Sequence, residues 1–428
     1  MATKAASASK QTASHLAAAL GGEGPDNARW ASALRLRCRL QPAGGPGTKV
    51  MPPTYAPERQ GEPPQYVRER RRIGDEDHEC VLLDGIASQA NRIEAALAAR
   101  VRAGEIPLPT IEVDQEEFGR HAGLEFSHRC FDAWIEDARL DGRRFGDTEI
   151  YKQLGASISR HDLSTLMQVF PVGILLGCWA SRSKNPQGTT RLARILSSEL
   201  LAVAAVEGRR PASRIDIHNV SAAIALYKPR DGDERFTLDE TRAAEEKGKP
   251  KLFRSGEGTS KAGKPSSAGY SNVTPTVTPS STGEGHGGIT MSYALQIATV
   301  SLPALRECGF PSEDGAREHD RDVAGRTLLA TLALRMLALQ VEHGYDLRSG
   351  CLLVPEEEPR IELIGRLGKV EAAWPVVELS SEELLREAID QGRGHGLSWE
   401  GQTIDLLASE AQMALLRRSL ARGEANAD

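Results

Sequence analysis

Two stretches of strict alternation constrain the fold of this chain more than any other feature. In the first stretch, the apolar residues Leu34, Leu36, Cys38 and Leu40 alternate with Arg35, Arg37 and Arg39. The second stretch, from Ile289 to Ile297, has an apolar residue at every second position. Alternate side chains of a β-strand point to the same face of its sheet, so both stretches predict strands with one buried face. The open face of the first strand then carries the three arginines.

Apolar patterns elsewhere predict a mixture of strands and helices. Strands are expected at 80–83, 110–113, 173–179, 351–354 and 361–364, and helices at 86–100, 192–206 and 323–341 and near residues 302, 382 and 405. Strands that alternate with helices indicate an α+β fold. A chain of 428 residues exceeds the usual size of one domain, and one core with large insertions fits its length as well as two domains do.

Two polar segments interrupt these patterns. Residues 41–72 are rich in proline and glycine and end in Arg68, Arg70, Arg71 and Arg72, which predicts a long loop or a protruding hairpin. Residues 247–264 contain six basic residues and one acidic residue with almost no apolar side chains, and the polar character continues to Gly288. A segment of this composition cannot pack on its own.

Cysteine spacing and terminal composition favour a cytoplasmic protein. The six cysteines are scattered without a C-x-x-C pair or a partner at zinc-ligand spacing, so we expect buried thiols in a reducing cytosol and no metal. Residues 1–26 lack the apolar core of a secretory signal, and no stretch approaches the roughly 20 apolar residues of a membrane span. We therefore expect no membrane partner.

Sequence motifs of enzymes are weak in this chain. The pattern Gly258–Lys264 has Pro265 where a phosphate-binding loop needs Ser or Thr, and the glycines of 283–288 precede a strand where a dinucleotide site needs a helix. No H-E-x-x-H or G-x-S-x-G motif occurs. The histidines His121, His128 and His161, which lie near Asp132 and Asp162, could assist acid-base cleavage of RNA, or they could be structural or solvated.

The segment from Asn185 to Arg194 is the strongest candidate for a phosphate site. Arg191 and Arg194 would begin the helix expected at 192–206, where free N–H groups and the helix dipole favour an anion, and Arg182 and Lys184 lie just upstream. A solvated helix start is the alternative. The three arginines of the first strand could likewise bind single-stranded RNA on a sheet surface, or form an ordinary solvated face.

Several short sequence blocks occur in order between about residue 30 and residue 355. The blocks are Cys80–Asp84 followed by Ser88–Glu94, then Gly188–Arg194, then Gly287–Thr290 with Ser301–Leu305, and Arg348–Cys351. The first three are similar to the motifs "S-x-A-N-R-L-E", "G-x-T-R-L-x-R" and "G-G-x-T…S-L-P-A-L". Together they resemble the type I-G (formerly I-U) CRISPR-associated RAMP family. Divergence is greatest in the N-terminal tail, in 229–286 and after 355.

This resemblance implies the repeated backbone subunit of a Cascade-type surveillance complex. Such a subunit binds crRNA and assembles in several copies along it, beside other subunits of the complex. The target DNA strand pairs with the guide RNA that the subunit holds. The resemblance implies that the subunit is not an enzyme and needs no cofactor. The implied fold is an RRM-like (ferredoxin-like) palm with large insertions that include a thumb hairpin, formed by 41–72 or by 229–286. We expect a flexible tail at 1–28 and a single core over 29–428, with insertions at 41–76 and 229–288 and a helix-rich C-terminal part at 312–428.

The resemblance also implies guide contacts at Gln89, Asn91 and Arg92 and within the Gly188–Arg194 block. The full predicted RNA-binding set is Arg35, Arg37, Arg39, Arg71, Arg72, Gln89, Asn91, Arg92, Arg182, Lys184, Gly188, Thr189, Arg191 and Arg194. Related type III backbones cleave RNA with an aspartate in the loop after the first strand. Here that loop begins Gln41–Gly45, and no Asp appears until Asp75, which favours binding. A RAMP-type endonuclease that processes or cleaves RNA is the alternative.

Overall fold

The structure, a computed structural model, has two compact units. It describes residues 2–56, 65–156, 160–180, 191–209, 211–254, 262–277, 287–379, 382–397 and 399–427. The larger unit comprises Met1–Thr48, Arg68–Ala204 and Met291–Asp428, and the smaller unit comprises Lys49–Val67 and Ala205–Thr290. Both polar segments of the sequence thus contribute to the smaller unit.

A nine-stranded antiparallel sheet forms the centre of the larger unit, within the residues that the structure describes. Seven of its strands lie in the order β18 (Tyr345–Arg348), β19 (Cys351–Pro355), β1 (Ala33–Pro42), β17 (Tyr293–Ser301), β10 (Leu196–Val203), β3 (Glu76–Asp84) and β2 (Arg68–Ile73). The strand β20 (Arg360–Ile364) also pairs with β1, and β21 (Val370–Pro375) pairs with β20. The alternating pattern of Leu34 to Leu40 is confirmed, because these apolar side chains are buried and Arg37 and Arg39 are exposed.

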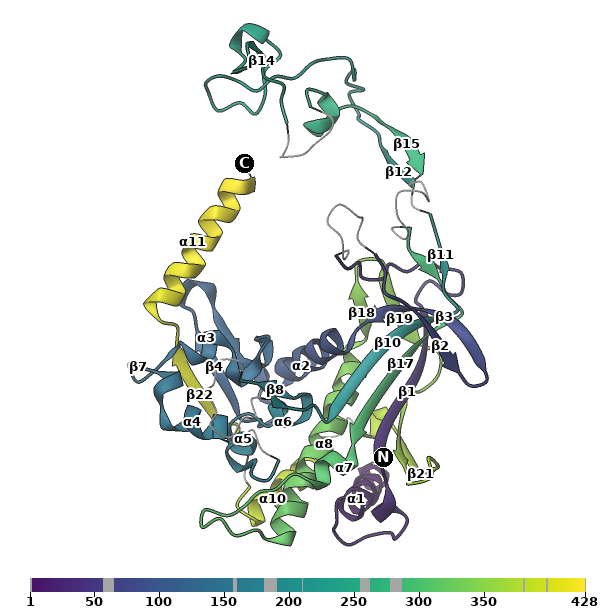
Figure 1. Ribbon diagram of the computed structural model, residues 1–428. Helices are drawn as coiled ribbons and strands as arrows, with labels where there is room; N and C mark the ends of the chain where they lie inside the picture. Colours follow the sequence, from purple (N-terminus) through teal and green to yellow (C-terminus); the bar gives the residue numbers. More distant parts are fainter. Residues whose placement is uncertain are drawn as a thin grey trace. The chain divides into compact units, whose positions relative to one another are not determined.

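Two long helices, α2 (Ile86–Arg102) and α8 (His319–His343), lie on the same side of this sheet (Figure 1). Every residue of α8 from Ala324 to Gln340 is buried, including Arg326 and Arg335, so this helix is enclosed on all sides. The short helix α7 (Leu302–Arg306) follows β17 directly. Its N-cap is Ser301, whose hydroxyl accepts the N–H of Ala304 at 3.3 Å, which gives the S-L-P-A-L block a structural reason.

A second sheet in the larger unit combines segments far apart in sequence. Its order is β5 (Arg120–Ala122), β4 (Thr110–Asp114), β22 (Thr403–Leu407), β6 (Arg139–Leu140) and β7 (Arg143–Arg144), and β22 runs parallel to β4. The remaining helices are α1 (Ala2–Ala19), α3 (Ala133–Glu136), α4 (Glu149–Ala156), α5 (Ser164–Val169), α6 (Val172–Leu176), α9 (Val376–Leu379), α10 (Glu382–Gly394) and α11 (Glu410–Ala427). The described residues therefore form a mixed α+β fold, as the sequence predicts.

The smaller unit is built from short antiparallel ribbons. These are β11 (Val206–Glu207) with β16 (Ile289–Thr290), β12 (Pro211–Arg214) with β15 (Val273–Val277), and β13 (Glu245–Glu246) with β14 (Lys249–Pro250). Val50 bridges to Ile289, which joins the two polar segments of the sequence. Leu226, Phe253 and Ala268 form a small buried cluster.

Two element predictions around the candidate phosphate segment are wrong. Residues 172–176 form helix α6 instead of a strand, because an apolar run this short does not distinguish a strand from a fully buried helix. Residues 196–203 form strand β10 instead of a helix, and both edges of β10 are paired, with β17 and with β3. The alternating burial of Leu196 to Leu200 fits that pairing. Arg191 and Arg194 consequently do not begin a helix.

The two ends of the chain also differ from expectation. Residues 2–19, expected to belong to a flexible tail, form α1, and its last turn buries Leu16, Ala18 and Ala19. A helix expected near Asp405 is the strand β22, and α11 begins only at Glu410. The prediction of buried thiols is confirmed, because all six cysteines are buried and free; burial raises the pKa of Cys38 to about 11 and that of Cys308 to about 12.

Candidate nucleic-acid interface

Arg191 and Arg194 lie at a small ribbon beside α6. Strand β9 (Arg191–Leu192) pairs antiparallel with β8 (Cys178–Trp179), so Arg191 lies opposite Trp179. Gly177 precedes β8 with φ 77° and ψ 157°, a conformation that is essentially restricted to glycine. A Cβ atom on Gly177 would lie 2.8 Å from the carbonyl oxygen of Leu192. Glycine at 177 therefore allows the two strands to approach each other.

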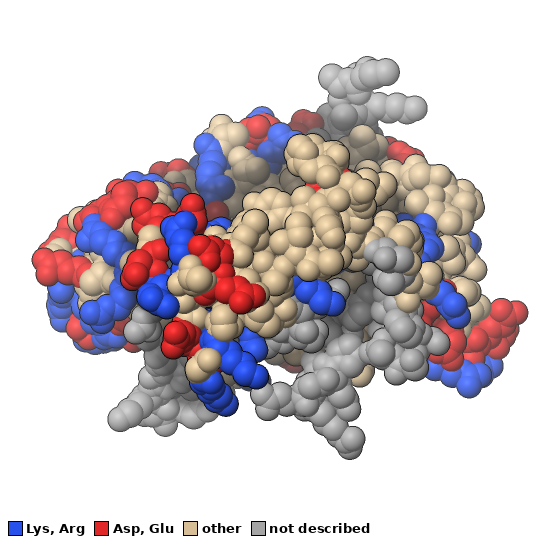
Figure 2. Space-filling model, turned by 90° about the horizontal axis from the view of Figure 1, so that it is seen from above, with Lys and Arg blue, Asp and Glu red and all other residues tan. Residues whose placement is uncertain are grey.

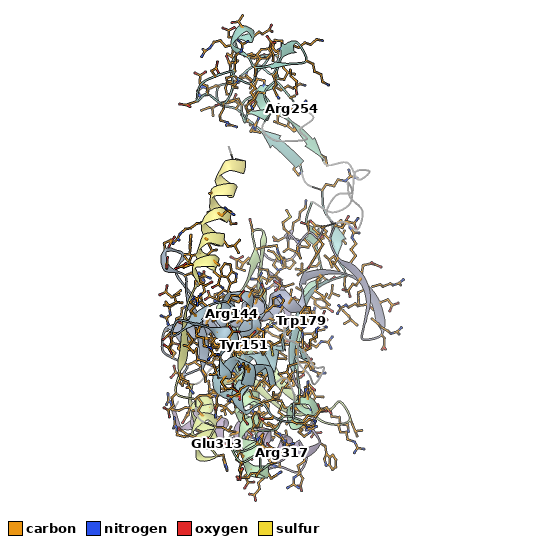
Figure 3. The ribbon with its side chains drawn as sticks, turned by 60° about the vertical axis from the view of Figure 1, so that its left-hand side comes forward. Arg144, Tyr151, Trp179, Arg254, Glu313 and Arg317 are labelled. Carbon is orange, nitrogen blue, oxygen red and sulfur yellow. The ribbon has the colours of Figure 1, made fainter. Side chains whose placement is uncertain are left out.

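An exposed aromatic ring and a guanidinium group stack at this ribbon. The indole of Trp179, labelled in Figure 3, is 39% exposed, and the Arg191 guanidinium carbon lies 4.4 Å from the ring centroid. The imidazole of His128 meets the same indole edge-on, with the ring centroids 5.8 Å apart. A pocket of about 520 Å³, here called the Trp179 pocket, is lined by residues 127–129, 176–179 and 191–194.

The cations of the Trp179 pocket differ in their partners. The guanidinium of Arg129 donates to both carboxylate oxygens of Glu94, at 2.7 and 3.0 Å, and to the carbonyl oxygen of Gly177. Burial raises the pKa of Glu94, and the charge of Arg129 opposes that shift. Arg191 and Arg194, in contrast, are exposed and form no ion pair with any residue that the structure describes. Within the described residues, the pocket therefore presents two positive charges without an ion-pair partner next to an exposed aromatic ring.

The open face of the large sheet carries the other predicted cations, and most of them are compensated. We call Arg35, Arg37 and Arg39 of β1 together with Arg71 of β2 the arginine face. Arg35 donates to Glu362 at 2.9 Å, and Arg39 lies 3.1 Å from Glu356 and 3.9 Å from the Tyr293 ring centroid.

Arg71 completes this pairing by binding both carboxylate oxygens of Glu199, at 2.5 and 3.1 Å, and its hydrogen bonds to Glu199 and Glu69 raise its pKa. Arg37 is exposed and has no partner in the described part of the chain. Arg72, also exposed, donates to the backbone oxygen of Asp75 at 3.2 Å. Figure 2 shows lysine and arginine side chains interspersed with aspartate and glutamate, without one continuous basic surface on the face that it presents.

The helix residues carried over from the family resemblance have mainly structural contacts. Gln89 is fully buried, and its amide nitrogen donates to Asp84 at 2.6 Å, so its side chain cannot reach a guide in this conformation. Arg92 donates to Asp84 at 2.8 Å and to the backbone oxygens of Asp346 and Leu347. Gln89 and Arg92 thus have partners inside the protein, and their contact with RNA stays a prediction. Asn91 is exposed, and the structure leaves it available.

Asp84 explains why these residues occur together. Its carboxylate is completely buried at the end of β3 and accepts hydrogen bonds from Ser88 and Gln89 as well as from Arg92, while Arg348 lies 3.4 Å away. A buried carboxylate requires such partners because burial without them is costly. Two of the sequence blocks, Ser88–Glu94 and Arg348–Cys351, thus meet at one structural ion cluster.

Residues 34–207 match a family whose description is CRISPR-associated protein GSU0053. That match indicates a CRISPR-associated protein family. The match covers less than half of the chain and suggests a role in CRISPR-Cas defence. The matched stretch contains β1 from Leu34 onward, Asp84 with its partners on α2, and the whole Trp179 pocket, while Arg348 of the Asp84 cluster lies outside it. No curated protein matches the chain.

Four members of the predicted RNA-binding set, Arg182, Lys184, Gly188 and Thr189, lie outside the described residues. Sequence reasoning missed Trp179 and His128 as parts of the site. An aromatic residue next to a run of basic residues is a signal for base stacking, and Trp179 precedes Arg182 and Lys184 in this way. A buried hydrogen-bond network also joins Gln89, Ser198, Gln296 and Gln340, and the sequence has no local signal for it.

The two aspartates near the candidate histidines accept hydrogen bonds from backbone N–H groups. Asp132 accepts hydrogen bonds from the backbone N–H groups of His128 and Trp134, and Asp162 accepts from that of Ser164. No group of three or more His, Cys, Asp or Glu side chains that could hold a metal ion occurs among residues that the structure describes. No helix in the described ranges is long and apolar enough to cross a membrane.

Proposed function

We propose that this chain is the crRNA-binding backbone subunit of a type I-G Cascade-type complex. The observation that carries the proposal is the pair of uncompensated arginines, Arg191 and Arg194, beside the exposed Trp179. Cations attract the phosphate backbone, and an aromatic face stacks a base without regard to its identity. A subunit repeated along a variable guide needs this kind of sequence-independent contact.

The connectivity of the large sheet supports an RRM-like palm. In the described chain, β1, α2, β10, β17, α8 and β20 follow one another with other elements between them, and the four strands lie in the order β20-β1-β17-β10. A β-α-β-β-α-β chain with the first and third strands central is the ferredoxin-like arrangement that RRM domains share. The smaller unit, to which both polar insertions contribute, is our candidate for the thumb.

Assembly would follow from the guide. Copies of the chain would line up head to tail along one crRNA in the cytoplasm, with other subunits of the complex beside them and with the target DNA strand paired to the guide. A head-to-tail contact that does not close produces a helical filament, and the RNA would limit its length. Elongated particles that contain RNA are the expected form of the purified complex.

The test compares two double variants that each lose two positive charges. Arg191→Ala with Arg194→Ala should weaken binding of a labelled CRISPR repeat-spacer RNA and reduce the slope of log K against log salt by about 1.4, since each phosphate contact of a single strand contributes about 0.7. Arg35→Ala with Arg39→Ala removes compensated charges and should leave the slope unchanged. Fluorescence anisotropy over several salt concentrations measures both. Equal slopes for the two variants would reject the site assignment.

We also propose that the subunit binds RNA without cleaving it. The alternative, a RAMP-type endonuclease that uses a histidine, predicts discrete products when labelled repeat RNA is incubated with the protein in the absence of metal. Loss of those products in His161→Ala would reject the pure binding role. Intact RNA in both samples, at a protein concentration that saturates binding, is the expected result.

A further inference from the structure

The Trp179 pocket depends on a ribbon that is too short to hold itself in place. Strand β8 has two residues, Cys178 and Trp179, and pairs with the two residues of β9. A single two-stranded ribbon is marginally stable at best in water. Gly177, which joins α6 to β8, is also the residue type with the greatest backbone freedom. Contacts from other elements must therefore fix the position of the Trp179 indole.

Arg129 supplies such a contact on the β8 side of the ribbon. Its guanidinium group donates to the carbonyl oxygen of Gly177 at 3.1 Å and to both carboxylate oxygens of Glu94 on α2, at 2.7 and 3.0 Å. The side chain of Arg129 is 14% exposed and that of Glu94 only 3%. An arginine that binds both oxygens of a carboxylate has a well-defined geometry. Arg129 thus connects the ribbon to a long helix of the larger unit.

The backbone of Arg129 has a conformation that needs support. Its φ is 55°, in the left-handed region that residues other than glycine seldom adopt. The buried carboxylate of Asp132 accepts the N–H groups of His128 and Trp134, each at 3.0 Å, and so fixes the chain on both sides of Arg129. Such conformations persist where the surrounding structure holds them, and they are frequent at functional sites. The turn thus directs the Arg129 side chain toward Gly177.

The same two segments also meet through their cysteines. Cys130 follows Arg129 and is fully buried, and Cys178 follows Gly177 and is buried as well. Burial raises the pKa of Cys130, and the neighbouring thiol of Cys178 raises it further. The hydrogen bond from Arg129 to Gly177 therefore lies beside a contact that excludes water, and a hydrogen bond in such surroundings is stronger than one in water.

We propose that Arg129 is a positioning residue of the RNA site, which holds the β8–β9 ribbon so that the Trp179 indole can stack a base. This inference rests on the proposed function, since it assigns a role within the Trp179 pocket. Glu94 neutralises the charge of Arg129, so Arg129 acts through Trp179 and makes no phosphate contact of its own. Glu94 is the last residue of the Ser88–Glu94 block, which this role connects to the pocket.

A double-mutant cycle tests whether Arg129 acts through Trp179. Glu94→Gln with Arg129→Gln removes both charges together, so no buried charge is left unpaired, and the shorter side chain at 129 cannot bind residue 94 and the Gly177 oxygen at once. Anisotropy should show that the repeat-spacer RNA binds at least about fivefold more weakly, the lower limit for loss of one stacked base. In the Trp179→Ala background the same two changes should alter affinity by less than about twofold, because the residue through which Arg129 acts is missing.

Arg144→Gln is the matched control. The guanidinium group of Arg144 also donates to two carboxylates, those of Glu136 and Asp137, at 2.7 and 2.8 Å, but it does not line the Trp179 pocket. RNA affinity should be unchanged in this variant. Thermal unfolding followed by circular dichroism shows that each variant is folded under the conditions of the binding measurement.

A spectroscopic measurement without RNA separates this inference from the proposed function. Incorporation of 5-fluorotryptophan labels all five tryptophans, and the fluorine resonance that is lost in Trp179→Phe is that of Trp179. In the RNA-free protein, Glu94→Gln with Arg129→Gln should shift the resonance of Trp179 and leave that of Trp30 in place. Arg144→Gln should leave both resonances in place.

Three results would overturn the positioning role. An unchanged Trp179 resonance would show that Arg129 does not hold the ribbon. Equal weakening of RNA binding with and without Trp179 would show that Arg129 contacts RNA itself. An effect of Arg144→Gln as large as that of the paired change would show a general effect of losing an arginine–carboxylate pair. Trp179→Ala without effect on RNA binding would instead reject the Trp179 pocket as the RNA site, and the resonance of Trp179 alone would then support or reject the hold of Arg129 on the ribbon.

Discussion

The arginine face and the Trp179 pocket present cations of the same kind with opposite surroundings. On the arginine face, Glu362, Glu356 and Glu199 each hold one arginine, and only Arg37 has no partner within the described residues. In the Trp179 pocket, Glu94 holds Arg129, while Arg191 and Arg194 are uncompensated. Local potential, more than the number of cations, decides where a phosphate backbone is attracted. The comparison therefore favours the Trp179 pocket over the arginine face as the proposed RNA site.

The same comparison separates structural arginines from binding arginines. Arg92 and Arg348 are the extreme structural case, because both lie next to the fully buried carboxylate of Asp84. Arg191 is the opposite case, since its guanidinium group stacks on the indole ring of Trp179 and has no ion-pair partner among the described residues. If this distinction is right, variants of the first group should affect stability and variants of the second group should affect RNA affinity.

The largest expected effect is on stability, in Asp84→Ala. Removing the buried carboxylate takes away the charged acceptor that Arg92 and Arg348 share, and losing one partner of a buried ion pair costs up to about 3–5 kcal/mol. Urea denaturation followed by circular dichroism measures the free energy of unfolding. Asp77→Ala is the control, because Asp77 is exposed and lies 3.6 Å from Arg70, so its loss should change stability by less than about 1 kcal/mol. Equal losses in the two variants would contradict a structural role for the Asp84 cluster.

Gly177→Ala should have the next largest effect, and it acts on the pocket itself. An alanine must adopt the positive φ of this position, and its Cβ would also lie 2.8 Å from the carbonyl oxygen of Leu192. The strained backbone alone costs about 1–3 kcal/mol, and the contact adds to it. Both stability and RNA affinity should fall, because β8 and β9 separate.

Gly142→Ala is the matched control for Gly177→Ala. Gly142 has nearly the same φ, 78°, with no atom near the position of a Cβ. It should therefore show only the backbone cost, and RNA binding should be unchanged. If the two variants are equally stable and bind RNA equally well, the close approach of β8 and β9 does not shape the pocket.

Trp179→Ala should weaken RNA binding without destabilising the fold. Loss of one base stacked on an aromatic side chain costs about 1–3 kcal/mol, which is about five- to 150-fold in affinity. Trp30→Ala provides a close control, because Trp30 is also exposed in the larger unit and has Arg366 5.6 Å from its ring centroid. Anisotropy with the repeat-spacer RNA measures both. An equal effect of the two changes would show that any exposed tryptophan contributes, and the pocket assignment would fail.

The sequence predicts the strands and helices that have a clear period. The strands at 80–83, 110–113, 351–354 and 361–364 and the helices at 86–100 and 323–341 are confirmed. Residues 192–206 are misassigned because small and apolar residues cluster there in a way that fits either period. These residues form a strand because β10 pairs with β17 and β3, and both partners are segments about 100 residues away in the sequence.

The candidate site is less predictable than the fold for a related reason. A sequence shows where cations lie, but their partners come from distant segments: Arg35 meets Glu362, which is 327 positions away. Trp179 stacks with Arg191 because the β8–β9 ribbon places the two residues opposite each other. That ribbon in turn requires the positive φ of Gly177. Whether an arginine is paired with a carboxylate thus depends on the fold and cannot be predicted from local composition.

The smallest expected effect comes from removing the acids of the arginine face. Glu356→Gln with Glu362→Gln leaves Arg35 and Arg39 uncompensated while retaining hydrogen-bond acceptors beside them. These ion pairs are partly exposed, so the free energy of unfolding should fall by less than about 1 kcal/mol. RNA affinity should change by less than about twofold, and the salt slope should not change, because the proposed guide contact is in the Trp179 pocket. A slope larger by about 1.4 would mean that two more phosphates lie against the sheet, and the arginine face would then be part of the path of the guide.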